Sequence, residues 1–304
     1  DLITNPNTRK KYQKLSYKNF YLSHQYVSKQ IDNVRFSLTK KFWPGIINSK
    51  SKLRILHITN FNERHNGRLY FNTGRRLNNG FIRLGHSVLE FSDRDIVSRG
   101  KSLKDFSGSN TLNDKLIKTC YHFKPDMIVL GHADMISKDI LYKLKKDYSN
   151  LKIAQWFLDP LNKNGPDFLK NRDRILDKSE ILDSNFLTTS PKAVDLLSKK
   201  INNYFIPNPS DSSMETLNNF NKECSNDVFF ALSHGVHRGQ LKIRSTDDRE
   251  KFIKNLQKKC KNIRFDLFGM NNIQPIWADQ YFKNISNSKM GLNLSRGTPI
   301  KYYS

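Results

Sequence analysis

Short apolar segments alternate with helix-forming segments along most of this 304-residue chain, and this alternation constrains the fold more than any other feature. Strands that alternate with helices along a chain form parallel sheets that helices cover on both faces. The sequence therefore predicts an α/β fold. The first series of candidate strands covers residues 53–59, 87–91, 127–130, 152–157, 185–189 and 204–206. Candidate helices cover residues 70–84, 111–123, 137–148 and 191–200, and a long polar loop with Gly165-Pro166 follows residue 157.

The alternation breaks at residues 207–226, which are rich in Pro, Ser, Asn and Asp, and then starts again. We therefore expect two Rossmann-like domains that face each other across a cleft, an N-terminal one at 53–208 and a C-terminal one at 227–304, joined by a hinge at 209–226. The second series has candidate strands at 227–232, 263–268 and 291–294, and candidate helices at 247–259 and 281–288. Doubly wound sheets usually have five or six strands, so we expect a second domain that is incomplete and truncated at the C-terminus.

Residues 1–52 form a basic segment that precedes the first strand. They hold 11 basic and 2 acidic side chains. Within residues 12–42, four apolar side chains recur at helical spacing (Val27, Ile31, Val34 and Leu38), which predicts a helix followed by a linker. Two interpretations stay open: this helix packs on the body of the protein, or residues 1–50 bind an anionic membrane surface.

The whole chain is strongly basic, with 52 Lys and Arg against 28 Asp and Glu, a net charge of +24. Such an excess attracts nucleic acid, anionic lipid or phosphorylated substrates, although abundant Lys, Asn and Ile also fit a simple compositional bias. No apolar run approaches the roughly 18–20 residues of a membrane-spanning helix. Three widely spaced cysteines exclude a disulfide scaffold and a four-cysteine zinc site. They favour a reducing compartment, so we expect a cytoplasmic protein, either free or peripheral to the inner face of the membrane.

Ligands of parallel α/β sheets bind beyond the carboxyl ends of the strands, which selects candidate residues. His132 follows the strand at 127–130 and is a candidate general base, or a structural histidine. Asp159 follows the strand at 152–157 and is either a second catalytic group or the cap of the next element. Asn66 and Gly67 belong to the polar loop after the first strand.

The loop after residues 227–232 has the composition of a phosphate-binding loop. It contains Gly235-Val236-His237-Arg238-Gly239, followed by Lys242. Glycines let the backbone approach a phosphate, and Arg offers it a bidentate fork, although solvated loop cations explain the pattern equally well. The Gly-Lys-Ser/Thr ending of a P-loop is absent. His234 and His237 have no adjacent third ligand, so we expect no metal site.

Several segments resemble the GT-B fold glycosyltransferases, and within them the spore-maturation CgeB-like branch of group 1-like enzymes. The resemblance extends over roughly residues 53–304 and is most specific in the C-terminal segments. The residues that carry it are 83–88 (RLGHSV), 205–209 (FIPNP), 231–239 (ALSHGVHRG), 265–270 (FDLFGM), 291–297 (GLNLSRG) and 301–304 (KYYS).

The resemblance implies a hexosyltransferase-like enzyme that moves a sugar from a nucleotide-diphosphate donor to an acceptor such as a cell-surface glycan. It implies no cofactor and no metal. By position, the diphosphate would be held by Arg238, Gly239 and Lys242, and the nucleoside pocket bordered by Gly269 and Met270. Asn66 and Gly67 would line the acceptor side of the cleft, and the catalytic candidates His132 and Asp159 would face the sugar. In such enzymes the acidic residue that holds the donor ribose lies beyond the last strand of this chain.

Two other functions compete with this hypothesis. The charge and the interleaved aromatic residues fit a nucleic-acid-binding α/β protein, but no recognised nucleic-acid motif is present, so we do not expect that partner. A non-catalytic sugar-nucleotide-binding module would have the same fold.

The first prediction concerns Arg238. A diphosphate leaving group gains negative charge as the glycosidic bond breaks, and a fixed guanidinium stabilises that charge. Arg238→Ala should therefore lower sugar transfer by about two to three orders of magnitude, the usual loss for one such donor. Arg238→Lys should restore only part of the activity, because a point charge cannot form the bidentate contact. Turnover of a sugar nucleotide measures both variants, and a wild-type rate in Arg238→Ala would contradict the assignment.

Overall fold

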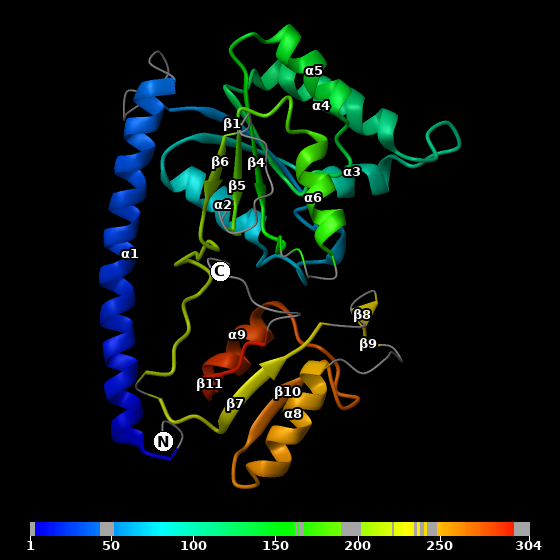
Figure 1. Cartoon of the computed structure of the whole chain (residues 1–304). Coiled ribbons are helices and arrows are strands. Elements are labelled where there is room, and N and C mark those ends of the chain that lie inside the picture. Colours follow the sequence, from blue (N-terminus) through cyan, green and yellow to red (C-terminus); the bar gives the residue numbers. More distant parts are fainter. Residues whose placement is uncertain are drawn as a thin grey trace. The chain divides into compact units, whose positions relative to one another are not determined.

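The computed structural model of the chain describes residues 4–42, 52–161, 163, 167–189, 202–220, 222–233, 236–237, 240–241 and 248–294. The chain forms two compact units (Figure 1). One unit is Lys52–Glu215, and the other combines Thr216–Leu294 with the N-terminal helix. The candidate helix at 191–200 lies outside the described residues.

The first unit is built on a six-stranded parallel sheet, as the alternation of the sequence predicts. Its strand order is β2-β1-β3-β4-β5-β6. The chain moves outward from β1 to β2 and then returns to place β3 on the other side of β1, so the topological switch point lies between β1 and β3. The strands are β1 (Arg54–Thr59), β2 (Ser87–Phe91), β3 (Met127–Gly131), β4 (Lys152–Phe157), β5 (Ser184–Leu187) and β6 (Asn203–Phe205).

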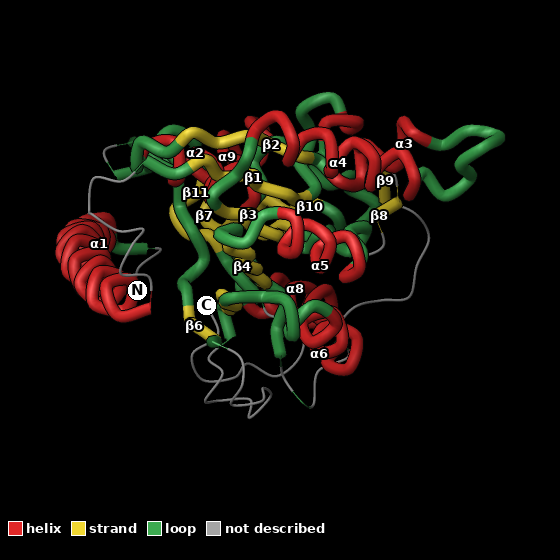
Figure 2. The backbone as a smooth tube through the Cα atoms, turned by 90° about the horizontal axis from the view of Figure 1, so that it is seen from above, coloured by secondary structure: helices red, strands yellow, loops and turns green. Residues whose placement is uncertain are grey.

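Helices cover both faces of this sheet. Figure 2 shows α3 (Asp93–Gly100), α4 (Ser109–Phe123) and α5 (Lys138–Asp147) on one side of the strands and α2 (Thr73–Arg83) on the other. Side chains alternate between the faces of a strand, so Leu56 and Ile58 of β1 join the core under α3, α4 and α5, whereas Ile55 packs on the α2 side.

Two helices of this unit were not predicted. Helix α6 (Phe168–Asp177) occupies part of the expected polar loop, and α3 occupies a segment to which the sequence assigned no element. Both have weak hydrophobic patterns: α6 contributes only Ile175 to a core cluster, and α3 contributes only Ile96 and Val97. Periodicity cannot reveal a helix that buries one or two apolar side chains.

The second unit contains a three-stranded parallel sheet with the order β10-β7-β11. Its strands are β7 (Asn226–Ala231), β10 (Phe265–Phe268) and β11 (Ser288–Gly291). Helices α8 (Asp248–Lys259) and α9 (Ala278–Ser286) complete it, with the short antiparallel pair β8 (Val236–His237) and β9 (Gln240–Leu241). The last strand was expected at 291–294, but it is Ser288–Gly291. Its first two residues, Ser288 and Lys289, are polar, so the apolar pattern does not mark where it begins. Lys289 Nζ lies 2.6 Å from the Asp227 carboxylate.

Helix α1 (Pro6–Phe42) confirms the helix predicted in the basic segment. Asn5 caps its start, since the Asn5 side chain accepts hydrogen bonds from the backbone N–H groups of Asn7 and Thr8. The apolar side chains of Val27, Ile31 and Val34 are exposed. Among the helices that the structure describes, none is long and apolar enough to cross a membrane.

The segment after β6 is fixed to α2 by buried polar contacts. The Asp211 side chain is fully buried and accepts hydrogen bonds from Arg83 at 2.7 Å and Asn79 at 2.8 Å. These bonds hold the pKa of Asp211 well below its usual range, against the opposing effect of burial. Glu215 accepts a further bond from Arg76 at 2.7 Å. Residues 209–215, assigned to the hinge by sequence, therefore belong to the first unit.

A chain of hydrogen bonds runs through the core beneath α2. Trp156 Nε1–H donates to His57 Nε2 at 3.2 Å, so the ring proton of His57 is on Nδ1 and donates to Asn78 Oδ1 at 3.2 Å. Asn78 in turn donates to Glu90 at 2.8 Å, and Arg75 pairs with Glu90. Burial lowers the pKa of His57 from 6.5 to about 4, so the imidazole is neutral in the folded chain.

Asp93, the first residue of α3, has the opposite titration behaviour. Burial raises its pKa from 3.8 to about 6. The backbone amides of Arg94 and Met135 partly offset this rise without forming a full hydrogen bond to either carboxylate oxygen. Between pH 4 and 6 the folded state therefore takes up a proton at Asp93 that the unfolded state does not, whereas at His57 the unfolded state takes up the proton.

The second prediction follows from these opposite signs. From pH 6.5 to pH 4, His57 removes about 3 kcal/mol from the free energy of unfolding, and Asp93 adds a similar amount. We expect the stability of His57→Gln, relative to wild type, to improve on acidification over this range. The relative stability of Asp93→Asn should fall. Urea unfolding at pH 6.5, 5.5 and 4.5 measures both.

The exposed imidazole of His122 on α4 provides the matched control. His122→Gln measures, at the same three pH values, the effect of removing an exposed imidazole. Equal pH dependence of His57→Gln and His122→Gln would contradict a neutral, buried His57.

Candidate functional site

The carboxyl edge of the first sheet brings polar side chains together at the switch point between β1 and β3. The loop at 60–72 leaves the carboxyl end of β1, and His132 immediately follows the carboxyl end of β3. Adjacent strands that continue in opposite directions leave a crevice at this position, where doubly wound proteins bind their ligands. The candidate site is therefore at this edge of the first unit.

His132 is fixed in an unusual backbone conformation. Its φ of 50° is left-handed, which non-glycine residues rarely adopt outside functional or tightly constrained turns. The ring stacks on Phe157 with centroids 4.4 Å apart and planes 7° from parallel. Its Nε2 accepts a long hydrogen bond of 3.5 Å from the Leu158 backbone N–H, which leaves the proton on Nδ1. That Nδ1 lies 3.9 Å from Asp159 Oδ2, so the protonated nitrogen faces a carboxylate.

Two arginines converge on the carboxylate of Asp134, two residues after His132. Arg174 of α6 reaches Asp134 Oδ2 with Nη2 at 2.7 Å, and Arg94 of α3 pairs with the same oxygen. Arg174 also lies 3.9 Å from Asp159 through its Nη1. These contacts join four separate segments (α3, α6 and the loops after β3 and β4) into one group of side chains. We call this group the carboxyl-edge cluster: Arg94, His132, Asp134, Asp159 and Arg174.

The charges of the cluster nearly balance around a neutral imidazole. Burial lowers the pKa of His132; Asp159 and Asp134 oppose that shift, and Arg174 and Arg94 add to it. A pKa shifted downward from its ordinary value favours the unprotonated imidazole near neutral pH. An unprotonated imidazole beside a carboxylate can accept a proton from a bound group, which is the requirement for a general base.

The loop after β1 is tied to the first turn of α3. The buried carboxylate of Asp95 accepts the backbone N–H of Glu63 at 2.8 Å and the Arg64 guanidinium at 2.9 Å. Beyond this anchor, Asn66 and Gly67 are exposed, with left-handed φ angles of 50° and 78°. Nothing lies within 4 Å of a Cβ built on Gly67, so its backbone angle, and not crowding, favours glycine there.

In the second unit the structure describes only two of the five predicted site residues, Gly269 and Met270. Arg238, Gly239 and Lys242 lie outside the described residues. Gly269 follows β10 with φ 73°, and a Cβ at this position would lie 1.8 Å from the Leu232 carbonyl oxygen, so only glycine fits. The Met270 side chain is 1% exposed and packs in the core with Ile253 and Leu267. At this edge both residues are buried: Met270 contributes packing, and the Gly269 N–H donates to the Ile273 carbonyl at 3.1 Å.

The structure thus brings His132 and Asp159 together, as their places after neighbouring strands suggested. Arg94 and Arg174 were not predicted, because they belong to the two helices that carry no clear sequence signal. Asp134 carried a sequence signal, since it lies two residues from His132 at a strand end. In the part of the chain that the structure describes, no three His, Cys, Asp or Glu side chains gather closely enough to hold a metal ion.

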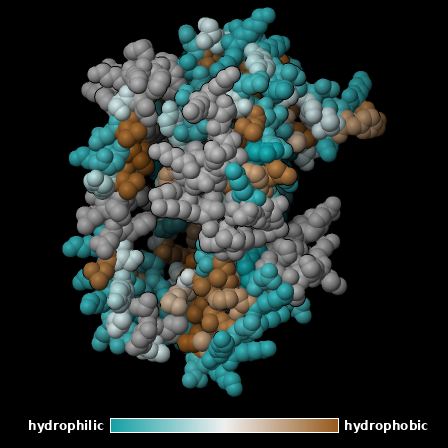
Figure 3. Space-filling view, viewed as in Figure 1, coloured by the Kyte–Doolittle hydropathy of each residue, from teal (hydrophilic) through white to brown (hydrophobic). Residues whose placement is uncertain are grey.

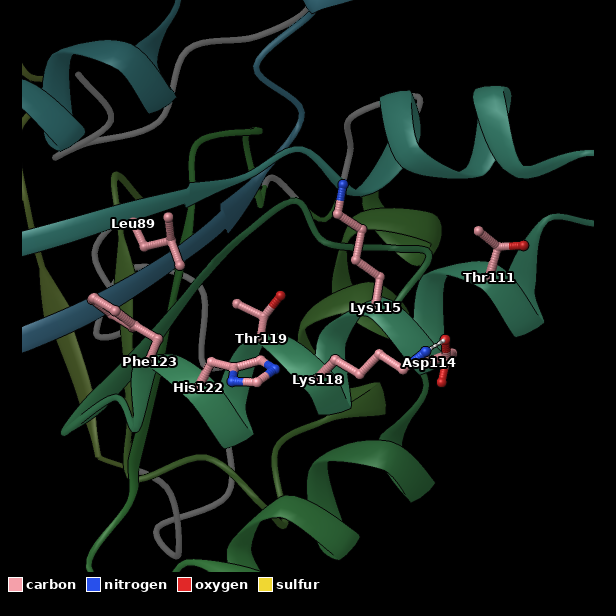
Figure 4. A pocket seen from close by; sticks show the side chains of 8 residues that line it. All are labelled: Leu89, Thr111, Asp114, Lys115, Lys118, Thr119, His122 and Phe123. Atoms are coloured by element: carbon pink, nitrogen blue, oxygen red, sulfur yellow. Dashed lines mark hydrogen bonds and ion pairs between the residues drawn. The ribbon is translucent and has the colours of Figure 1, made fainter.

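A separate depression of about 430 Å³ lies between α4 and the edge strand β2 (Figure 4). Its lining includes Leu89, Lys115, Lys118 and His122, and Lys118 pairs with Asp114 at 2.7 Å. It shares no residue with the carboxyl-edge cluster. It also has no buried polar group directed into it, so we assign it no part in the chemistry.

Comparisons with known proteins add little to this geometry. No protein-family model matches the chain, and no curated protein matches it. Among solved structures, the chain is similar to the crystal structure of the glycosyltransferase SnogD from Streptomyces nogalater, with 14% sequence identity over 81% of this chain and 72% of that one. The TM-score is 0.37, which is too low to establish a shared fold.

The third prediction concerns the charges around His132. Asp159→Asn should lower the pKa of His132 further, because it removes the carboxylate that favours the imidazolium. Arg174→Gln should raise it, because it removes a repelling cation. NMR titration of the histidine ring protons measures both shifts, and His132→Gln identifies the signal by its loss.

The exposed pair of Arg172 and Asp173 on α6 supplies a control. Asp173→Asn should leave the His132 titration unchanged. Shifts of the same sign in Asp159→Asn and Arg174→Gln would show that His132 does not lie between these two charges.

Proposed function

We propose that this chain is a GT-B type glycosyltransferase that transfers a sugar from a nucleotide-diphosphate donor to a hydroxyl acceptor. The observation that carries the proposal is the position of His132 at the switch point of a doubly wound sheet, with its Nδ1 3.9 Å from Asp159 Oδ2. Two further features support it: the chain contains two parallel α/β units, and its C-terminal segments resemble the CgeB-like enzymes. In this proposal the first unit is the acceptor domain and the second is the donor domain.

In this proposal His132 acts as general base on the acceptor. Its Nε2 lone pair takes the hydroxyl proton while the acceptor oxygen attacks the donor sugar. The long 3.5 Å bond from Leu158 N–H is weak enough for an acceptor hydroxyl to replace it. The imidazolium that forms has its Nδ1–H directed at Asp159, whose negative charge stabilises it. Arg174 and Arg94 hold Asp134 in place and keep the cluster near neutrality.

The donor half of the site is assigned by resemblance. Arg238 and Lys242 would bind the diphosphate, and Gly239 would let the backbone approach it. Gly269 and Met270 would border the nucleoside pocket, with the Met270 side chain supporting it from within the core. Arg238 and Lys242 would supply the positive charge that a metal supplies elsewhere, so we propose a metal-independent transfer. Asn66 and Gly67, on the exposed loop after β1, would contact the acceptor, with a cell-surface glycan as the proposed class.

The fourth prediction tests the role of His132. His132→Ala should lower turnover of the sugar nucleotide by about 10²–10⁴, the usual contribution of a general base. Asp159→Asn should reduce it less and shift the acidic limb of the pH profile to lower pH, because loss of the carboxylate lowers the pKa of His132, the general base. His122→Ala, on the outer surface of α4, is the matched control and should retain wild-type turnover.

The same assay separates the competing functions. Turnover that survives a chelator supports metal independence, and turnover that requires a divalent metal contradicts it. Tight binding of uridine diphosphate without turnover of any donor would favour a non-catalytic binding module. Binding of an oligonucleotide at moderate salt, without binding of nucleotide sugars, would favour a nucleic-acid-binding protein.

A further inference from the structure

The loop at 101–108, between α3 and α4, exposes two large apolar side chains at its tip. Leu103 is 88% exposed and Phe106 is 78% exposed, the two highest values among the large hydrophobic side chains that the structure describes. The loop extends beyond the ends of both helices at the right of Figure 1. The same projection has a hydrophobic, brown tip in Figure 3. Single exposed apolar residues are common, but two together on a projecting tip indicate an interaction site.

The loop is a defined turn. Ser102 and Asp105 exchange backbone hydrogen bonds of 3.1 Å in both directions. The Asp105 carboxylate accepts bonds from the backbone N–H of Thr111 at 2.8 Å, the Thr111 hydroxyl at 3.0 Å and the Ser107 hydroxyl at 3.2 Å. The turn therefore holds Leu103 and Phe106 outward without help from a packed core, and little further conformational entropy is lost when they bind.

The exposed surface of this turn is basic. Lys101 and Lys104 are exposed beside the two apolar side chains, and neither has an ion-pair partner among the residues that the structure describes. The one acidic residue of the turn, Asp105, is buried and directs its carboxylate inward to Thr111 and Ser107. A partner surface therefore meets two apolar side chains flanked by two positive charges.

We propose that the loop at 101–108 docks the protein on an anionic lipid bilayer. Leu103 and Phe106 insert among the acyl chains near the headgroups, and Lys101 and Lys104 remain at the level of the lipid phosphates. Apolar burial and attraction to anionic lipid are the two forces that hold interfacial proteins on membranes. A patch of two side chains is too small for a stable protein–protein interface, which buries about 800 Å² per partner, whereas a bilayer needs only a small wedge.

Docking through this loop would place the candidate site close to the membrane. Helix α3 connects the two: Arg94 of the carboxyl-edge cluster is in its first turn, and Lys101 directly follows its last residue. Eight helical residues span about 12 Å. The cluster would therefore lie within reach of a molecule whose lipid part remains in the bilayer.

Vesicle sedimentation of the whole chain tests the proposal. Wild-type protein should bind vesicles of phosphatidylcholine with 30% phosphatidylglycerol, a composition chosen for the experiment, and bind pure phosphatidylcholine far less. Leu103→Ser with Phe106→Ser should lower the affinity for the anionic vesicles at least tenfold. Lys101→Gln with Lys104→Gln should lower it by about fivefold for each charge removed. All four positions are exposed, so these variants keep the fold, and unchanged circular dichroism verifies this.

The matched control removes exposed apolar side chains elsewhere on the same unit. Tyr121 on α4 and Leu169 on α6 are 65% and 61% exposed. Tyr121→Ser with Leu169→Ser should bind anionic vesicles as wild type does. Equal binding by wild type and the Leu103/Phe106 variant would overturn the proposal and would leave another surface, such as basic helix α1, as the one that binds lipid. Equal losses in the control and the Leu103/Phe106 variant would overturn it as well.

A fluorescence experiment reports insertion directly. Phe106→Trp adds a tryptophan at the tip of the loop, and its emission should shift to shorter wavelength when anionic vesicles are added. Lipids brominated on their acyl chains should quench this added emission. Leu169→Trp, on α6, should show neither effect. Emission from Phe106→Trp that stays unchanged with vesicles, or that changes only with a protein partner, would overturn membrane insertion.

Discussion

The first turn of α3 is the interaction on which the candidate site depends. Three successive charged residues of this turn, Asp93, Arg94 and Asp95, make different contacts. Asp95 holds the loop after β1 through the Glu63 amide and the Arg64 guanidinium, and Arg94 pairs with Asp134 in the loop after β3. Asp93 is buried near the Met135 backbone amide, in the loop after β3. The two loops that flank the switch point are thus positioned by one short helix, which binds both of them with charge-assisted hydrogen bonds.

Buried ionisable groups in this unit oppose one another. His57 stays neutral because burial penalises the imidazolium, and it is fixed between Trp156 and Asn78 by two hydrogen bonds. Burial of Asp93 penalises its carboxylate in the same way. Since one group resists taking up a proton and the other resists losing one, their contributions to the pH dependence of folding nearly cancel. The free energy of unfolding can therefore change little between pH 6.5 and 4 although the pKa values of both His57 and Asp93 are strongly shifted.

The strongest elements of the fold were predictable, and the weakest were not. Buried parallel strands such as β3 and β4 are continuous apolar runs, so their position in the sequence is clear. Helices α3 and α6 bury few apolar side chains and gain much of their tertiary contact from charged residues, which carry no periodic signal. The same difference decides which site residues were predictable. His132 and Asp159 follow strands with a clear apolar pattern, so they were predicted as candidates. Arg94 and Arg174 belong to the two helices that have no such pattern.

The sequence by itself determined the α/β class, the succession of the principal strands along the chain and the positions where polar residues follow strand ends. It did so because burial on both faces of a parallel sheet leaves a continuous apolar signature. Only the tertiary structure decided which residues meet there. Strand order placed β3 beside β1, and so set His132 next to the loop after β1. Ion pairs between Asp134 and arginines 40 residues away in each direction assembled the cluster. Such contacts depend on distances in space between residues far apart in the chain, and no local pattern of residues encodes them.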